Sequence, residues 1–252
     1  MIRDPLSRRD CWEHGVYMTL SDFEPLRFTF EIRFQQSPTM WDSAGRISSF
    51  LQSRIPSLEL DINSVSPSRI VFSLMPNCEL HFEIDKAFII VYKPSRMAKE
   101  LFPLAAAITD AANQFLNIPV FNRIGTRLIF GRDFDTSAEA ATQVLACKNL
   151  TVPTRKVFDQ DLSPTSAGFN FRWEGPVRGA TLMISVENEK FELKAAPVHF
   201  GRFESIEKTS HFLKLDCDYF TTVPVAKEQF EPETWIKNAV HIFNRDISEF
   251  LG

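Results

Sequence analysis

Residues 26–35 run Leu-Arg-Phe-Thr-Phe-Glu-Ile-Arg-Phe-Gln, with an apolar residue at every second position from 26 to 34. Successive side chains of a strand point to opposite faces, so this period of two separates an apolar row from a polar row. The apolar row contains Phe28, Phe30, Ile32 and Phe34. The stretch therefore predicts a half-buried β-strand, with Arg27, Thr29, Glu31 and Arg33 on its other face.

Four more short strands are expected close behind it, at 58–62, 69–75, 79–84 and 87–92. Three turn-forming pairs separate these four strands from one another, namely Ser66-Pro67, Pro76-Asn77 and Asp85-Lys86. Connections this short require antiparallel pairing, because parallel strands need crossovers of about a dozen residues or more. This part of the chain therefore predicts an antiparallel meander.

The apolar period changes to that of a helix in three places. A helix is expected after Thr39, with Trp41, Ile47, Phe50 and Leu51 on its apolar face. Two longer helices are expected at 103–117 and 232–251, each with a proline at its first position, where the missing N–H costs nothing. A strand at 120–130 and a short Ala-rich helix at 136–148 lie between them.

The same order of elements returns in the second half of the chain. Strands are expected at 168–173, 180–187, 190–195 and 212–220, ahead of the closing helix. Ala98-Lys99-Glu100 before the first long helix matches Ala226-Lys227-Glu228 before the second. We therefore predict an α+β fold made of two related halves, each an antiparallel meander followed by a long helix packed on its sheet. The predicted division is 1–148 and 166–252, joined by a polar connecting segment at 149–165.

Composition and charge narrow the possible functions. The net charge is −4, which argues against broad binding to nucleic acid or to anionic membranes. No apolar run approaches the length of a membrane span, so no membrane partner is expected. The four cysteines are widely spaced and the first residues lack the apolar core of a signal peptide. These features predict a cytoplasmic protein with reduced thiols.

The least ordinary segment contains Arg123, Gly125 and Arg127, which share one face of the predicted strand. Two guanidinium groups on either side of a glycine could clamp a phosphate or a carboxylate. The simpler interpretation is a solvated face, or arginines paired with acidic residues of the second half.

A second candidate site contains Asp216 and Asp218, two residues apart on one strand, with His211 nearby. Paired carboxylates can bind Mg²⁺ for phosphoryl-transfer or nuclease chemistry. Ordinary alternation produces the same pattern, and the two aspartates could instead meet Arg123 or Arg127 across the interface between the halves. No metal ligand set and no catalytic residue is assigned.

No cofactor is expected either, because the chain contains no dinucleotide-binding or P-loop glycine motif.

The chain resembles an uncharacterised, sporadically distributed bacterial protein family of about 250 residues. The resemblance rests on two segments together, Arg123-Ile-Gly125-Thr-Arg127 and Leu215-Asp216-Cys217-Asp218 with the closing helix. The resemblance implies a bacterial, cytoplasmic protein and carries no activity with it.

Three functional hypotheses remain open. The first is a non-enzymatic interaction protein that presents sheet edges or a groove to a protein partner, with a homodimer as one form. The second is a metal-dependent hydrolase or nuclease that uses Asp216 and Asp218. The third is a protein that holds a small apolar ligand between helix and sheet, near Phe115 and Phe243.

Overall fold

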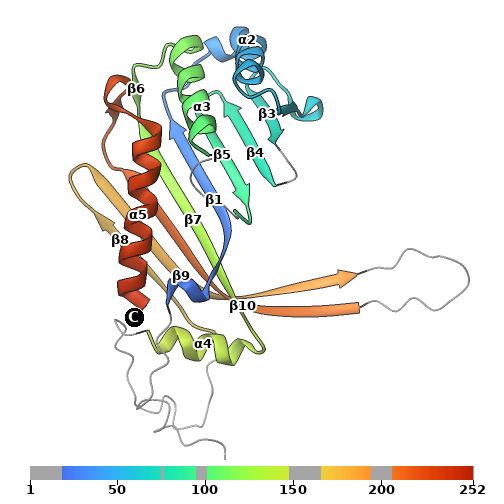
Figure 1. Cartoon of the computed structure of the whole chain (residues 1–252), viewed down its shortest axis with the longest axis vertical. Helices are drawn as coiled ribbons and strands as arrows, with labels where there is room; N and C mark the ends of the chain where they lie inside the picture. The colour runs from blue at the N-terminus through green and yellow to red at the C-terminus, as the bar shows by residue number, and fades with distance from the viewer. Residues whose placement is uncertain (1–18, 75–76, 95–100, 148–165, 194–205, 252) are drawn as a thin grey trace, which may run out of the picture.

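The computed structural model describes residues 19–74, 77–94, 101–147, 166–193 and 206–251 (Figure 1). Its fold is α+β, as predicted from the sequence. The helices are α2 (Thr39–Arg54), α3 (Leu101–Phe115), α4 (Ser137–Leu145) and α5 (Pro232–Leu251). The longer strands are β1 (Glu24–Arg33), β3 (Arg69–Leu74), β4 (Cys78–Glu83), β5 (Lys86–Tyr92), β7 (Arg123–Phe134), β8 (Gly168–Glu174), β9 (Arg178–Leu193) and β10 (Ile206–Thr221). The short ones are β2 (Glu59–Leu60), β6 (Val120–Phe121) and β11 (Val225–Ala226).

Strands from both halves of the chain form a single nine-stranded sheet, in the order β2-β3-β4-β5-β1-β7-β10-β9-β8. Every neighbouring pair is antiparallel. The central pair is β1 and β7, in a register that places Arg33 opposite Arg123 and Thr29 opposite Arg127. The halves therefore share one continuous sheet.

The longer elements follow the order β-α-β-β-β-α twice, first from β1 to α3 and then from β7 to α5. On this order the second series begins at Arg123, well before the predicted connecting segment. That segment lies outside the described residues. That the two series are related copies stays a prediction.

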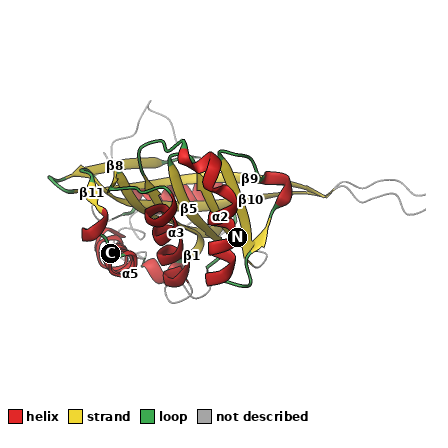
Figure 2. Ribbon diagram, turned by 90° about the horizontal axis from the view of Figure 1, so that it is seen from above, coloured by secondary structure: helices red, strands yellow, loops and turns green. Residues whose placement is uncertain are grey.

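The helices α2, α3 and α5 cover one face of the sheet (Figures 1 and 2). The apolar rows of the strands lie beneath them, and Phe28, Phe30 and Ile32 of β1 are fully buried there. On α5, Trp235 donates a hydrogen bond from Nε1 to the Thr126 hydroxyl of β7 at 3.0 Å and stacks on Tyr219 of β10. This contact fixes the C-terminal helix over the junction of β7 and β10.

Several expected elements differ in extent. The strands predicted at 180–187 and 190–195 are one continuous strand, β9, because it pairs with β10 along its whole length. The strand predicted at 120–130 divides into β6, which pairs with β11, and β7. The helix α3 begins at Leu101, so Pro103 does not occupy its first position, whereas α5 does begin at Pro232. Trp41 was wrongly placed on the apolar face of α2, because its side chain is 60% exposed.

The outer ends of β9 and β10 extend beyond the body of the sheet as a two-stranded arm (Figure 1). The strand β7 pairs with β10 only from His211 to Phe220, while the pairing of β9 with β10 continues to Ile206.

None of the described helices combines the length and the apolar character that a membrane crossing requires.

Candidate functional site

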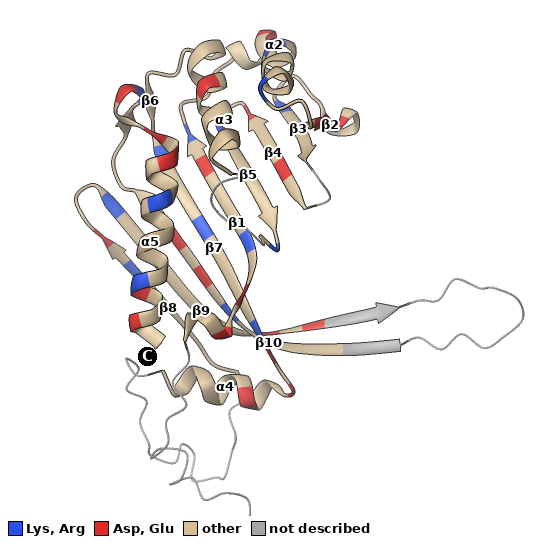
Figure 3. Ribbon diagram, viewed as in Figure 1, with Lys and Arg blue, Asp and Glu red and all other residues tan. Residues whose placement is uncertain are grey.

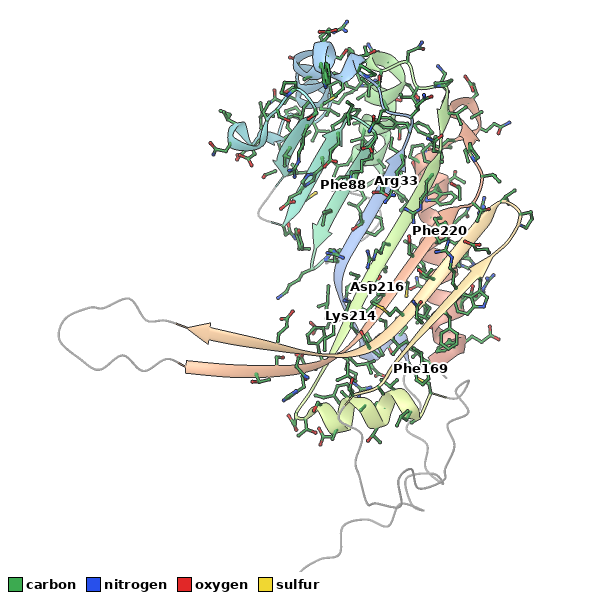
Figure 4. The ribbon with its side chains drawn as sticks, turned by 180° about the vertical axis from the view of Figure 1, so that it is seen from behind. Arg33, Phe88, Phe169, Lys214, Asp216 and Phe220 are labelled. Atoms are coloured by element: carbon green, nitrogen blue, oxygen red, sulfur yellow. The ribbon has the colours of Figure 1, made fainter. Side chains whose placement is uncertain are left out.

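No described helix covers the face of the sheet opposite α2, α3 and α5, and we call this face the open face (Figure 4). Alternation along β1, β7 and β10 places a set of charged residues there, side by side across three neighbouring strands (Figure 3). They are Glu31, Arg33, Arg123, Arg127, Asp216 and Asp218. Arg33 on β1 and Asp216 and Phe220 on β10 lie on this face (Figure 4). The open face is thus where the residues singled out from the sequence come together.

Arg123 connects all three strands. Its Nη1 donates to Oε1 of Glu31 on β1 at 2.9 Å, and its Nη2 donates to Oδ2 of Asp218 on β10 at 2.6 Å. Glu31 also accepts a bond of 2.7 Å from Nε of Arg33. The Arg123 guanidinium lies over Gly125, where an added Cβ would come within 2.9 Å of Nη1. The room at Gly125 is therefore filled by Arg123, and the expected approach of a ligand to this backbone is closed.

Arg127 and Asp216 form a bidentate ion pair. The Nε and Nη2 atoms of Arg127 donate to Oδ1 and Oδ2 of Asp216 at 2.7 and 2.5 Å. Asp216 is only 4% exposed, whereas the Arg127 side chain is 45% exposed. The hydrogen bond to Asp216 raises the pKa of Arg127 above its ordinary value. The pairing of Arg123 and Arg127 with these two aspartates, which the sequence suggested, is present.

The negative charge of Asp218 is only partly compensated by the arginines beside it. Burial raises the pKa of its carboxyl group, and the positive charges of Arg123 and Arg127 only partly oppose that effect. A carboxylate that is partly desolvated and already bonded to an arginine has little capacity left for a metal ion.

The metal-dependent hydrolase hypothesis loses its ligands in this arrangement. Both carboxylates are engaged by arginines, and His211 lies on the other face of β10, where its Nδ1 is 2.6 Å from Oδ1 of Asn188. Within the described ranges, no group of three or more His, Cys, Asp or Glu side chains is placed to hold a metal ion.

The apolar-ligand hypothesis gains no support. Phe243 is 4% exposed within the core, and Phe115 packs edge-on against Phe50 with ring centroids 5.4 Å apart. Two hollows lie instead on the open face, where charged side chains line much of their walls.

Phe220 is a member of the site that the sequence did not indicate. Its ring lies between two guanidinium groups, 4.8 Å from Cζ of Arg123 and 5.3 Å from Cζ of Arg172. The ring also covers Gly179, where an added Cβ would come within 2.8 Å of it. The only sequence signal was that Phe220 shares the strand parity of Asp216 and Asp218.

Arg27 is the second residue that sequence reasoning missed. It lies on the open face of β1, opposite Ile129 of β7. Its Nε is buried and has no hydrogen-bond partner within the described part of the chain. Its position in the polar row was visible in the sequence, but the lack of an acidic partner in the described structure depends on which strands lie beside it.

No family model matches the chain, and no curated protein matches it at a significant level. The resemblance to the uncharacterised bacterial family stays a prediction.

Proposed function

We propose that this protein is a non-enzymatic interaction module that pairs with a second copy of itself through the outer edge of β8. The observation that carries the proposal is the position of β8 at the end of the sheet, where its only partner among the described strands is β9. A free strand edge presents unpaired N–H and C=O groups that another strand can bind. The opposite edge is β2, which is only two residues long and offers little to pair with.

The backbone of β8 indicates which groups face outward. Gly175 donates its N–H to the Arg178 carbonyl, and the Ala167 carbonyl accepts from Val186. Because hydrogen-bonded and non-hydrogen-bonded positions alternate in antiparallel strands, the odd-numbered residues of β8 bond to β9. The even-numbered residues therefore direct their N–H and C=O groups toward the free edge, namely Gly168, Asn170, Arg172 and Glu174.

The side chains of β8 favour a strand partner over water. The strand contains neither proline nor lysine, and its two charged side chains, Arg172 and Glu174, form an ion pair with each other. Phe169, Phe171 and Trp173 form a stacked row, with neighbouring centroids 6.3 and 5.7 Å apart. Trp173 is 50% exposed, and the adjoining hairpin adds Val177 at 55%. Phe169 and Phe171 are half-buried, and Phe171 also packs edge-on against Phe250 of α5, so Trp173 and Val177 supply the exposed apolar surface beside the free edge.

The sequence of β8 is complementary to itself in the antiparallel direction. If a twofold axis passes between the Phe171 residues of two copies, all seven residues of one β8 pair with the seven of the other. Phe169 of one copy then lies opposite Trp173 of the other. The same register sets Asn170 opposite Arg172, so outward-facing backbone groups meet outward-facing groups. The aromatic residues then occupy the non-hydrogen-bonded positions, where side chains approach most closely. Each such cross-strand pair contributes about 0.2–1 kcal/mol.

The experiment is a measurement of mass in solution by light scattering and native mass spectrometry. The wild-type chain is expected to have twice its monomer mass. Asn170→Pro removes an outward N–H and no bond to β9, so it should give a folded monomer, whereas Asn170→Ala keeps that N–H and should stay dimeric. Far-UV circular dichroism checks that both variants fold. A monomeric wild type, or a dimeric Asn170→Pro variant, would contradict the proposal.

A further inference from the structure

The open face contains a hollow of about 270 Å³ that carries a surplus of positive charge. Five cationic side chains and two carboxylates line it, although the whole chain has a net charge of −4. The cationic side chains are Arg27, Arg33, Lys86, Arg123 and Arg127. A hollow of this volume suits a small molecule, and its charge favours an anion.

Four of the five cations already have an acidic partner. Arg33 bonds to Glu31, Arg123 to Glu31 and Asp218, and Arg127 to Asp216. Lys86 lies 3.4 Å from the carboxylate of Glu83.

Arg27 has no ion pair among the described residues. Its buried Nε also lacks a hydrogen bond there. A buried donor without a partner is costly and calls for an explanation, which a bound anion would supply.

The register of β1 and β7 places two further donors beside Arg27. Thr29 is two residues along on the same face and lies directly opposite Arg127. In the described structure the Thr29 hydroxyl makes no hydrogen bond. Arg127 uses Nε and Nη2 for Asp216, so its Nη1 hydrogens remain available on a side chain that is 45% exposed.

We propose that Arg27, Thr29 and Arg127 bind a small oxyanion, the phosphate or carboxylate group of an organic molecule, on the open face. The Arg27 guanidinium, the Thr29 hydroxyl and Nη1 of Arg127 donate to its oxygens, and charge-assisted bonds of this kind are among the stronger ones in proteins. This site replaces the clamp of Arg123, Gly125 and Arg127 suggested by the sequence, because Arg123 is committed to two carboxylates and covers Gly125.

The wall of the hollow defines the rest of the ligand. Ile90 and Phe88 line it beside the cations, and Phe88 stacks on His81 at 4.4 Å with an interplanar angle of 8°. The stacking leaves Phe88 little freedom to rotate. An apolar or aromatic body attached to the anionic group can therefore lie on this wall, and an aromatic phosphate or carboxylate fits better than inorganic phosphate.

Titration calorimetry at constant ionic strength tests the proposal with three probes: inorganic phosphate, phenyl phosphate and benzoate. Binding of phenyl phosphate or benzoate is expected, and tighter binding of one of them assigns the ligand to phosphates or to carboxylates. No heat and no thermal stabilisation with any probe would overturn the proposal.

Substitution of Arg27 separates a binding role from a structural one. Arg27→Met keeps the apolar stem and removes the unpartnered donor, so the ligand-free variant should be at least as stable as wild type. Its affinity for the probe should fall roughly 10- to 100-fold, the range of one charge-assisted hydrogen bond. The control is Lys237→Met on α5, at the opposite face of the sheet and 57% exposed, which should bind like wild type. Unchanged affinity in Arg27→Met would overturn the proposal.

Discussion

The pair formed by Arg127 and Asp216 should respond unequally to the loss of either partner. Arg127→Met leaves the Asp216 carboxylate, which is 4% exposed, buried without a counter-charge. Removing one partner of a buried pair typically costs 3–5 kcal/mol. Because Arg127 is itself 45% exposed, water can reach this side of the pair, and we expect the low end of that range, about 3 kcal/mol.

The reverse substitution should cost much less. Asp216→Asn leaves Arg127 free to turn toward solvent, and the amide oxygen of Asn can still accept one of its two hydrogen bonds. The expected loss is about 1 kcal/mol, close to that of a half-exposed pair. The double variant Arg127→Met/Asp216→Leu removes both charges from the site and should be more stable than Arg127→Met alone.

Urea unfolding at neutral pH, followed by far-UV circular dichroism, measures these differences as changes in the free energy of unfolding. The control is Lys237→Met on α5, where Lys237 and its partner Glu233 are 57% and 48% exposed. This variant should stay within about 0.5 kcal/mol of wild type. Equal losses from Arg127→Met and Asp216→Asn, or a double variant no more stable than Arg127→Met, would refute the reasoning from burial.

Two further predictions follow from the same face. Gly179→Ala should lose about 1–3 kcal/mol in urea unfolding, because its Cβ meets the Phe220 ring at 2.8 Å, whereas Gly45→Ala in α2 has open space and should gain up to about 1 kcal/mol. Equal stabilities of the two variants would contradict this. Burial raises the pKa of Asp218. Between the ordinary aspartate pKa and this raised value, the folded chain therefore holds a proton there that the unfolded chain has already released. Wild type should therefore lose stability relative to Asp218→Asn as the pH rises from the ordinary aspartate range through the raised pKa, and the opposite slope in paired urea titrations would rule it out.

Local chemistry alone determined much of this protein. The alternation of residues 26–35 predicted β1 and the face on which its side chains from Arg27 to Arg33 lie, because the period of two is a property of the extended backbone. The helix α5 has the bounds expected from its apolar stripe and its first proline, since both signals act within a few residues. The same local rule placed Arg123, Gly125 and Arg127 on one face, and Asp216 and Asp218 on another strand.

The tertiary structure decided which strands are neighbours, and the character of the site follows from that choice. Glu31 is 92 residues from Arg123 in the sequence and accepts its hydrogen bond only because β1 and β7 are adjacent. The covering of Gly179 by Phe220 has the same origin, and so has the lack of an acidic partner for Arg27 among the described residues. Alternation fixes the face of a strand on which a side chain lies, but the register between distant strands fixes the charge it meets there. That register is selected by burial of the whole sheet beneath its helices, a sum over many residues that no local pattern contains.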